Sequence, residues 1–276
     1  MIKQAIIPLA GLGTRLLPLT SVFAKELLPI NGKPSIEYIL DECIDAGVSE
    51  IIFIISKKKE MIKQYFHNDN FYKSLIKKKK DLRIIKEYQK ILKYKKKIKF
   101  VYQNKPLGTG DAVLKTKKFI KNRYFLMLLP DDLIMKKNCS KDMIKLHKKY
   151  KASVMASMTV KKNNVNRWGI FSVSKKIGKK NFVISDVIEK PSTREAPSNN
   201  AVIGRYILSK DIFKILKNQK KGKGGEIHIT DSIRTMIDNK FLFVGHKFSG
   251  KYLDCGSMDG YIKSTLEVAK LWIFAL

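Results

Sequence analysis

The amino-acid sequence predicts an α/β fold built around a doubly wound, mostly parallel mixed sheet. Short apolar runs typical of buried strands alternate with helical patterns up to about residue 160. A glycine loop directly follows the first of these runs, and residues 161–250 are richer in strand patterns. We therefore expect one domain over residues 1–276, with halves at 1–160 and 161–250 and a helical C-terminal segment at 251–276.

The first half begins with a buried strand at 5–9 and continues as strands and helices in alternation. In the helix expected at 35–46, apolar side chains recur with the helical period, at Ile36, Ile39, Leu40 and Cys43. The other strands are expected at 51–55, 99–103, 125–129 and 153–159, and the other helices at 58–97 (long and lysine-rich), 110–120 and 139–150.

In the second half, the mixed pattern predicts more strands than helices. The polar stretch 192–200 is an expected loop, because Pro191 and Pro197 interrupt regular structure there. The expected strands are 169–173, 183–189, 201–208 and 241–248, and the expected helices are 210–217, 230–239 and 257–271.

Three polar motifs follow expected strand ends. The glycine loop follows strand 5–9, residues 103–110 follow the strand at 99–103, and Asp131 follows the strand at 125–129. In open α/β sheets, ligands bind beyond the carboxyl ends of the strands. We therefore expect these three motifs to line one crevice.

The glycine loop predicts a phosphate-binding site. Gly11 and Gly13 have no Cβ, so backbone N–H groups there can approach a phosphate closely. Arg15 adds a planar fork of donors and Lys25 adds a compact positive charge. This combination favours binding of a nucleoside triphosphate.

Two better-known nucleotide loops do not fit. The dinucleotide fingerprint requires a third glycine where this chain has Leu16. Residues 245–251 approach the P-loop spacing, but Tyr252 replaces the serine or threonine that holds magnesium, and no helix is expected to begin there. We expect a hairpin-like turn at 245–251 instead.

The composition suggests a second class of function. The formal net charge of +32 would suit a nucleic-acid-binding protein. However, the lysines occur in scattered runs (57–59, 77–80 and 95–97), and aromatic-spaced RNA-binding motifs do not accompany them. We favour solvated helix faces and loops, whose positive field would also steer polyanionic substrates toward the protein.

The sequence favours a cytoplasmic protein. No apolar run approaches the roughly 20 residues of a membrane-spanning helix, and no signal-peptide pattern precedes the first strand. Cys43, Cys139 and Cys255 are odd in number and widely spaced, which predicts reduced thiols. We expect neither a membrane nor a nucleic acid as a partner.

Ordered motifs cover nearly the whole chain. Near the N-terminus these are Gly11-Leu-Gly-Thr-Arg15, Pro18-Leu-Thr20, Lys25-Glu-Leu-Leu-Pro29 and Lys33-Pro34. Further along they are Gln103 with Gly108-Thr-Gly-Asp-Ala112, Leu129-Pro-Asp131, Trp168-Gly169, Glu189-Lys-Pro191, Ala196-Pro-Ser-Asn-Asn200, Gly204-Arg-Tyr206, Glu226-Ile-His-Ile-Thr-Asp231 and Asp254-Cys-Gly256. The first set strongly resembles the signature of sugar-nucleotide pyrophosphorylases. The second is similar to that of the bacterial UTP–glucose-1-phosphate uridylyltransferase family.

The resemblance implies a Rossmann-like nucleotidyltransferase fold with a β-rich sugar-binding half. It also implies that UTP and glucose 1-phosphate are joined to UDP-glucose with release of pyrophosphate. Because the attacking sugar-phosphate oxygen is already an anion, such catalysis requires positioning and charge stabilisation and needs no general base. The expected catalytic residues are Arg15, Lys25, Asp131 and Lys190.

The resemblance also implies two sets of binding residues. Gln103 would read the uracil edge, since an amide can donate and accept hydrogen bonds at once. Glu189 would bind sugar hydroxyls and Lys190 the sugar's phosphate, whereas Asp111 stands where some relatives have histidine and has no assigned role. The nucleotide set is Ala10, Gly11, Leu12, Gly13, Thr14, Gln103 and Gly108, and the sugar-phosphate set is Gly169, Glu189, Lys190 and Gly204, the two glycines leaving room for the sugar ring.

Mg²⁺ is the expected cofactor. Asp131 would hold the ion, because magnesium prefers few carboxylates together with phosphate oxygens and waters. Asp254 matches a position that supplies a second metal contact in related enzymes. The neighbouring Asp132 is expected to face the other way, in a turn or supporting role. The four histidines show neither metal nor triad spacing, so zinc chemistry is not expected.

Three alternatives remain at this point. A glucose-1-phosphate thymidylyltransferase would share the fold and mechanism but usually lacks the insertion at 57–97. A catalytically weak paralogue would have lost residues that are present here. A basic nucleic-acid-binding protein would explain the charge but not the order of the motifs. For the favoured enzyme we expect a homodimer or homotetramer.

Overall fold

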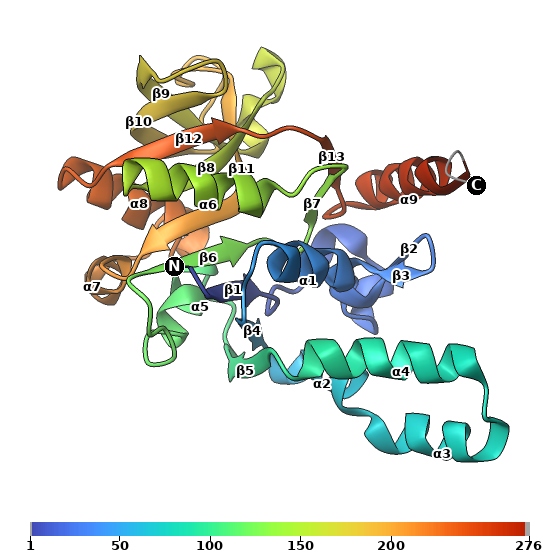
Figure 1. Cartoon of the computed structure of the whole chain (residues 1–276). Helices are drawn as coiled ribbons and strands as arrows, with labels where there is room; N and C mark the ends of the chain where they lie inside the picture. Colours follow the sequence, from blue (N-terminus) through green and yellow to red (C-terminus); the bar gives the residue numbers. More distant parts are fainter. Residues whose placement is uncertain (1, 274–276) are drawn as a thin grey trace.

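In the computed structural model, which describes residues 2–273, a nine-stranded mixed sheet runs through the molecule (Figure 1). From edge to edge its strands are β5 (Ile98–Tyr102), β4 (Glu50–Ile55), β1 (Gln4–Pro8), β6 (Tyr124–Leu128), β11 (Asn200–Ser209), β8 (Ser153–Thr159), β12 (Phe243–Lys247), β10 (Asn181–Glu189) and β9 (Gly169–Lys176). The first four are parallel, as are β8 and β12, and the other neighbours are antiparallel. The predicted α/β fold with a mixed sheet is confirmed.

Helices cover both faces of this sheet. Because successive strand residues point to opposite faces, Ile7 and Phe53 pack in the core with α1, α2, α4 and α6, whereas Ile6 and Ile52 pack in the core with α5, α7 and α8. The helices are α1 (Ser35–Asp45), α2 (Glu60–His67), α3 (Asp69–Lys79), α4 (Leu82–Lys95), α5 (Thr109–Lys115), α6 (Cys139–Tyr150), α7 (Ile212–Asn218), α8 (Ile229–Asp238) and α9 (Met258–Ile273). Short 3-10 helices occupy η1 (Thr14–Leu16), η2 (Leu19–Ser21), η3 (Lys25–Leu27), η4 (Lys57–Lys59), η5 (Lys162–Arg167) and η6 (Lys223–Gly225).

The lysine-rich stretch differs most from expectation. Instead of one long helix over 58–97 it forms α2, α3 and α4, which extend from the body beside β5 (Figure 1). Lys80 adopts a left-handed conformation that ends α3, and the Asp81 side chain accepts a hydrogen bond from the Arg83 N–H and so caps α4. The break between α3 and α4 therefore comes from local capping at Lys80 and Asp81, although the lysine-rich pattern continues across it.

Two short strand pairs were not anticipated. β7 (Asp132–Met135) pairs with β13 (Lys251–Asp254), and β2 (Pro29–Ile30) pairs with β3 (Lys33–Pro34). Because β12 and β13 belong to different sheets, the expected hairpin-like turn at 245–251 is wrong: this segment connects the main sheet to the β7–β13 pair. It opens no helix, so it is not a P-loop either.

Strands from both predicted halves enter the same sheet, since β11 lies between β6 and β8. The division of the chain near residue 160 stays a prediction. None of the helices within residues 2–273 combines the length and apolar character that crossing a bilayer requires.

Candidate active site

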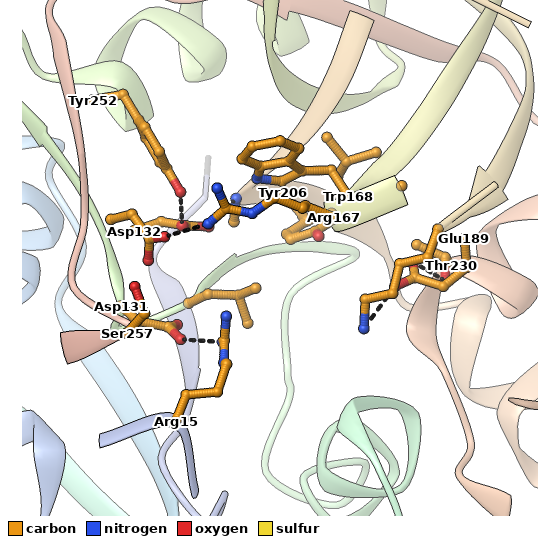
Figure 2. A pocket seen from close by; sticks show the side chains of 16 residues that line it. Arg15, Asp131, Asp132, Arg167, Trp168, Glu189, Tyr206, Thr230, Tyr252 and Ser257 are labelled. Carbon is orange, nitrogen blue, oxygen red and sulfur yellow. Dashed lines mark hydrogen bonds and ion pairs between the residues drawn. The ribbon is translucent and has the colours of Figure 1, made fainter. Parts of the chain in front are cut away.

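A cavity of about 560 Å³ opens beyond the carboxyl end of β6. Arg15, Asp131 and Ser257 line one side of it, and Glu189 and Thr230 line the opposite side (Figure 2). The structure thus brings together seven of the predicted site residues in one cavity: Arg15, Asp131, Gly169, Glu189, Lys190, Gly204 and Asp254.

Asp131 is the charged centre of the first side. Nζ of Lys25, from η3, lies 2.8 Å from Asp131 Oδ2, and Nη2 of Arg15, from η1, lies 3.6 Å from the same oxygen. Burial disfavours both charged forms, but Lys25 lowers the pKa of the Asp131 carboxyl, and Asp131 with Glu26 raises the pKa of the Lys25 ammonium. Both groups are therefore held ionised, with two cations facing one carboxylate.

Asp132 also lines the cavity, so the expectation that it faces away is wrong. The chain turns between the end of β6 and the start of β7, so strand alternation does not carry across Asp131 and Asp132. Asp132 accepts hydrogen bonds from the Gly204 N–H (2.8 Å) and the Tyr252 hydroxyl (2.5 Å). Burial, followed by the charge of Asp131, raises the pKa of Asp132.

Asp254 approaches Asp131 from the end of β13. A Cβ built on Gly256 would lie 2.7 Å from Asp131 Oδ2 and 3.2 Å from Asp254 Oδ1, so both carboxylates reach the same small region. Asp254 Oδ2 also lies 3.2 Å from Nη2 of Arg167, whose guanidinium stacks over the Trp168 ring. Two carboxylates could bind a cation here, with its remaining ligands supplied by a substrate or water.

The opposite side carries groups suited to a hydroxylated, phosphorylated ligand. The Thr230 hydroxyl, on α8, donates a hydrogen bond to Glu189 Oε2 (3.0 Å) at the end of β10. Lys190 Nζ lies 3.7 Å from the other carboxylate oxygen of Glu189, and its side chain is about half exposed. A carboxylate and a half-exposed ammonium are thus presented together.

Gly204 lines the cavity, and its lack of a side chain also has a packing role that the sequence did not indicate. A Cβ there would lie 2.5 Å from both the Leu129 Cβ and Asp132 Oδ2. β11 must therefore carry glycine at this point to pack against the turn that follows β6. The absence of a side chain at Gly204 serves this packing, and its role of leaving room for a sugar ring stays a prediction.

The remaining predicted residues lie outside the lining of this cavity. In the glycine loop, Ala10 is buried, Gly13 is half-buried, and Gly11, Leu12 and Thr14 are exposed. Lys25 borders a small adjoining cavity together with Asp131.

Gln103 and Gly108 occupy a separate place at the end of β5 and the start of α5. Gln103 Nε2 donates to the Gly108 carbonyl (3.0 Å) and to Asp111 Oδ2 (2.8 Å). Both amide donors are therefore used within the protein, and the expected role of Gln103 toward the uracil edge stays a prediction.

Several site residues were missed by sequence reasoning. Thr230 and Trp168 lie inside recognised motifs, so their positions in those motifs could have identified them. Arg167 and Tyr252 lie just outside motifs. Lys59 was hidden in a lysine run, yet its Nζ lies 2.8 Å from both carboxylate oxygens of buried Glu26, beside Lys25. No sequence pattern separates this lysine from its solvated neighbours.

Comparison with known proteins shows the family to which this chain belongs. The model of the nucleotidyl transferase family matches residues 4–270. A UTP–glucose-1-phosphate uridylyltransferase of Streptococcus pyogenes is 36% identical, over 97% of this chain and 89% of its own. The chain belongs to the UTP–glucose-1-phosphate uridylyltransferases, within the nucleotidyl transferase family.

Solved structures of similar uridylyltransferases agree with this membership. A UDP-glucose pyrophosphorylase complexed with UDP-glucose superposes with a TM-score of 0.86 at 35% identity, covering 98% of this chain and 99% of that one. A UTP-bound enzyme from Acinetobacter baumannii superposes with a TM-score of 0.86 at 33% identity, covering 97% and 93%. The recognised motifs therefore identified the right family.

Proposed function

We propose that this chain transfers a uridylyl group from UTP to glucose 1-phosphate, giving UDP-glucose and pyrophosphate. One observation carries the proposal. The Arg15–Asp131–Lys25 cluster lies across a 560 Å³ cavity from the Glu189–Lys190 pair. Two polyanionic substrates need cations at two separate points, and this arrangement supplies them.

The reaction is an in-line displacement at phosphorus. An oxygen of the sugar phosphate forms a bond to the α-phosphorus of UTP, and the bond from that phosphorus to the oxygen bridging to pyrophosphate breaks. Arg15 and Lys25 would bind the triphosphate and stabilise the charge that develops on the departing pyrophosphate. Lys190 would hold the attacking phosphate, while Glu189 orients the sugar through its hydroxyls.

The carboxylates of Asp131 and Asp254 suit a magnesium ion. They reach one region beside Gly256, and Mg²⁺ in phosphoryl-transfer sites is bound by one or two carboxylates together with substrate phosphates and waters. When bound, the ion would neutralise phosphate charge. Arg167, which pairs with Asp254 in this structure, would then be free to turn toward a phosphate.

The direct test is product formation by the purified chain. UTP, glucose 1-phosphate and Mg²⁺ should yield UDP-glucose and pyrophosphate in equal amounts, detected by chromatography and by a coupled pyrophosphate assay. EDTA should stop the reaction, and added Mg²⁺ should restore it. UTP consumption without UDP-glucose, or no turnover with any pairing of nucleotide and sugar 1-phosphate, would contradict the proposal.

A further inference from the structure

Lys25 has a second carboxylate beside it. The next residue in η3 is Glu26, whose side chain is only 1% exposed. Glu26 borders the same small cavity as Lys25 and Asp131. Burial disfavours the charged form of Lys25, but Asp131 and then Glu26 raise the pKa of its ammonium. Asp131 and Glu26 are therefore two possible partners for one ammonium group.

Glu26 is already engaged by another lysine. Nζ of Lys59, in η4, lies 2.8 Å from both carboxylate oxygens of Glu26. Lys59 is itself buried, and it follows the buried strand β4, so the core of the sheet sets its position. Because the Lys59 ammonium engages both oxygens, Glu26 has an ion-pair partner other than Lys25.

The backbone of η3 is held from the side of α1. The Ser35 hydroxyl donates a hydrogen bond to the Glu26 carbonyl (3.0 Å), and the Ser35 N–H donates to the Leu28 carbonyl (3.1 Å). A single 3-10 turn of three residues has little stability of its own, so these contacts fix it. With the Glu26 side chain held at η4, Lys25 is left to extend toward Asp131, 2.8 Å away.

Stability alone does not account for a buried ion pair at this place. Taking two charges out of water costs about as much as their attraction returns, so a well-packed apolar pair would stabilise the fold equally well. Removing one partner leaves an uncompensated buried charge, which attracts any cation within reach. For Glu26 without Lys59, that cation is Lys25, because both border the same cavity.

We propose that Lys59 is a positioning residue that occupies Glu26 and so leaves Lys25 to Asp131 and to the phosphates of the nucleotide. The inference rests on the proposed function for the role of Lys25 toward the triphosphate and the departing pyrophosphate. Without Lys59, Glu26 would compete for the Lys25 ammonium and draw it away from those phosphates. Lys59 does not line the large cavity, so it acts through these two side chains.

Lys59→Met tests the inference, because it removes the ammonium and keeps an unbranched side chain at a buried position. Pyrophosphate binding in the presence of Mg²⁺ is measured by calorimetry, and steady-state kinetics with each substrate varied in turn, on protein shown to be folded by circular dichroism. Pyrophosphate should bind about tenfold more weakly and kcat should fall about tenfold. KM for glucose 1-phosphate should stay unchanged. A purely structural role would not separate the two ligands in this way.

Three further variants separate positioning from folding. Lys59→Arg should retain the pyrophosphate affinity of wild type, because a guanidinium can also engage both oxygens of a carboxylate. Lys59→Met/Glu26→Gln should recover most of the lost affinity, because the competing charge is gone. Lys58→Met removes the exposed neighbour in the same turn, so it is the matched control and should behave as wild type.

Unchanged pyrophosphate binding and kcat in folded Lys59→Met would overturn the inference, as would a double variant as impaired as the single one. If Lys59→Met fails to fold, Lys59→Gln replaces it, because an amide can still donate a hydrogen bond to Glu26 but carries no charge. Wild-type protein that does not bind pyrophosphate would also overturn the inference. Failure of the proposed function would be distinct, because the pyrophosphate effects would persist while no UDP-glucose forms.

Discussion

At Asp131, in the turn that follows β6, one carboxylate faces two cations. Asp131→Asn keeps the shape of the side chain and removes its charge, so Lys25 and Arg15 lose their partner and the proposed Mg²⁺ loses one of its two carboxylates. We expect turnover to be nearly abolished with an unchanged circular dichroism spectrum. Asp142→Asn, which removes a partly exposed carboxylate paired with Lys145 on α6, is the control. Activity of Asp131→Asn within a few-fold of wild type at saturating Mg²⁺ would remove Asp131 from the metal site.

Lys190 is half exposed and positioned beside Glu189. Lys190→Ala should chiefly impair the use of glucose 1-phosphate, because an ammonium bound to a phosphate is worth roughly 1.5–3 kcal/mol, or about one to two decades in catalytic efficiency. Steady-state kinetics with each substrate varied in turn check this, with Lys175→Ala on β9 as the control. Weakened UTP binding with unchanged sugar-phosphate binding would mean that the two phosphate sites are assigned in reverse.

At the scale of elements, a buried ion pair joins η3 to η4. Glu26 and Lys59 are almost fully buried, and burial outweighs the attraction of Glu26 and lowers the pKa of Lys59. Lys59→Met leaves Glu26 buried without a cation, which should cost about 3–5 kcal/mol of unfolding free energy in urea denaturation. The double variant Lys59→Met/Glu26→Gln should recover part of that loss. A loss below about 1 kcal/mol for Lys59→Met would show that the pair is not structurally important.

The helices of the lysine-rich extension should differ in local stability from those of the body. α3 has no buried residue, whereas α6 buries Cys139, Ser140, Met143 and Ile144. Regions with few buried contacts open more often, so amide hydrogens of α3 should exchange faster than those of α6. Equal protection in the two helices, measured by hydrogen–deuterium exchange, would mean that another surface covers α3.

Elements with clear periodicity could be predicted from sequence, and those defined by tertiary pairing could not. α6 and β8 have the predicted bounds because helix and strand patterns are local signals, and in the structure the Asn138 side chain caps α6. β7 and β13 were missed because each is short and pairs with a segment more than a hundred residues away in sequence. In the sequence Lys59 resembles the other lysines of its run. Only the folded structure shows that η3 places Glu26 against it.

At the scale of the whole molecule, the order of the motifs was more informative than the composition. A net charge of +32 suggested a polyanion-binding protein. The motifs instead identified the family, and seven of the residues predicted from them line one cavity. Their exact roles, and the expected homodimer or homotetramer, stay predictions. Sequence could not foresee that Asp132 lines the cavity or that Gln103 has both donors engaged, because both depend on contacts between distant segments.

The central claim is that this chain is a uridylyltransferase acting on glucose 1-phosphate, and comparing UTP with dTTP tests it most directly. The two nucleotides differ by one methyl and one hydroxyl, and an added methyl alone discriminates by only about 1–3 kcal/mol, so some activity with dTTP is expected. At equal free Mg²⁺ and with glucose 1-phosphate, kcat/KM should be higher for UTP than for dTTP, and far higher than for ATP or GTP. A higher kcat/KM with dTTP would contradict the account and would identify a thymidylyltransferase.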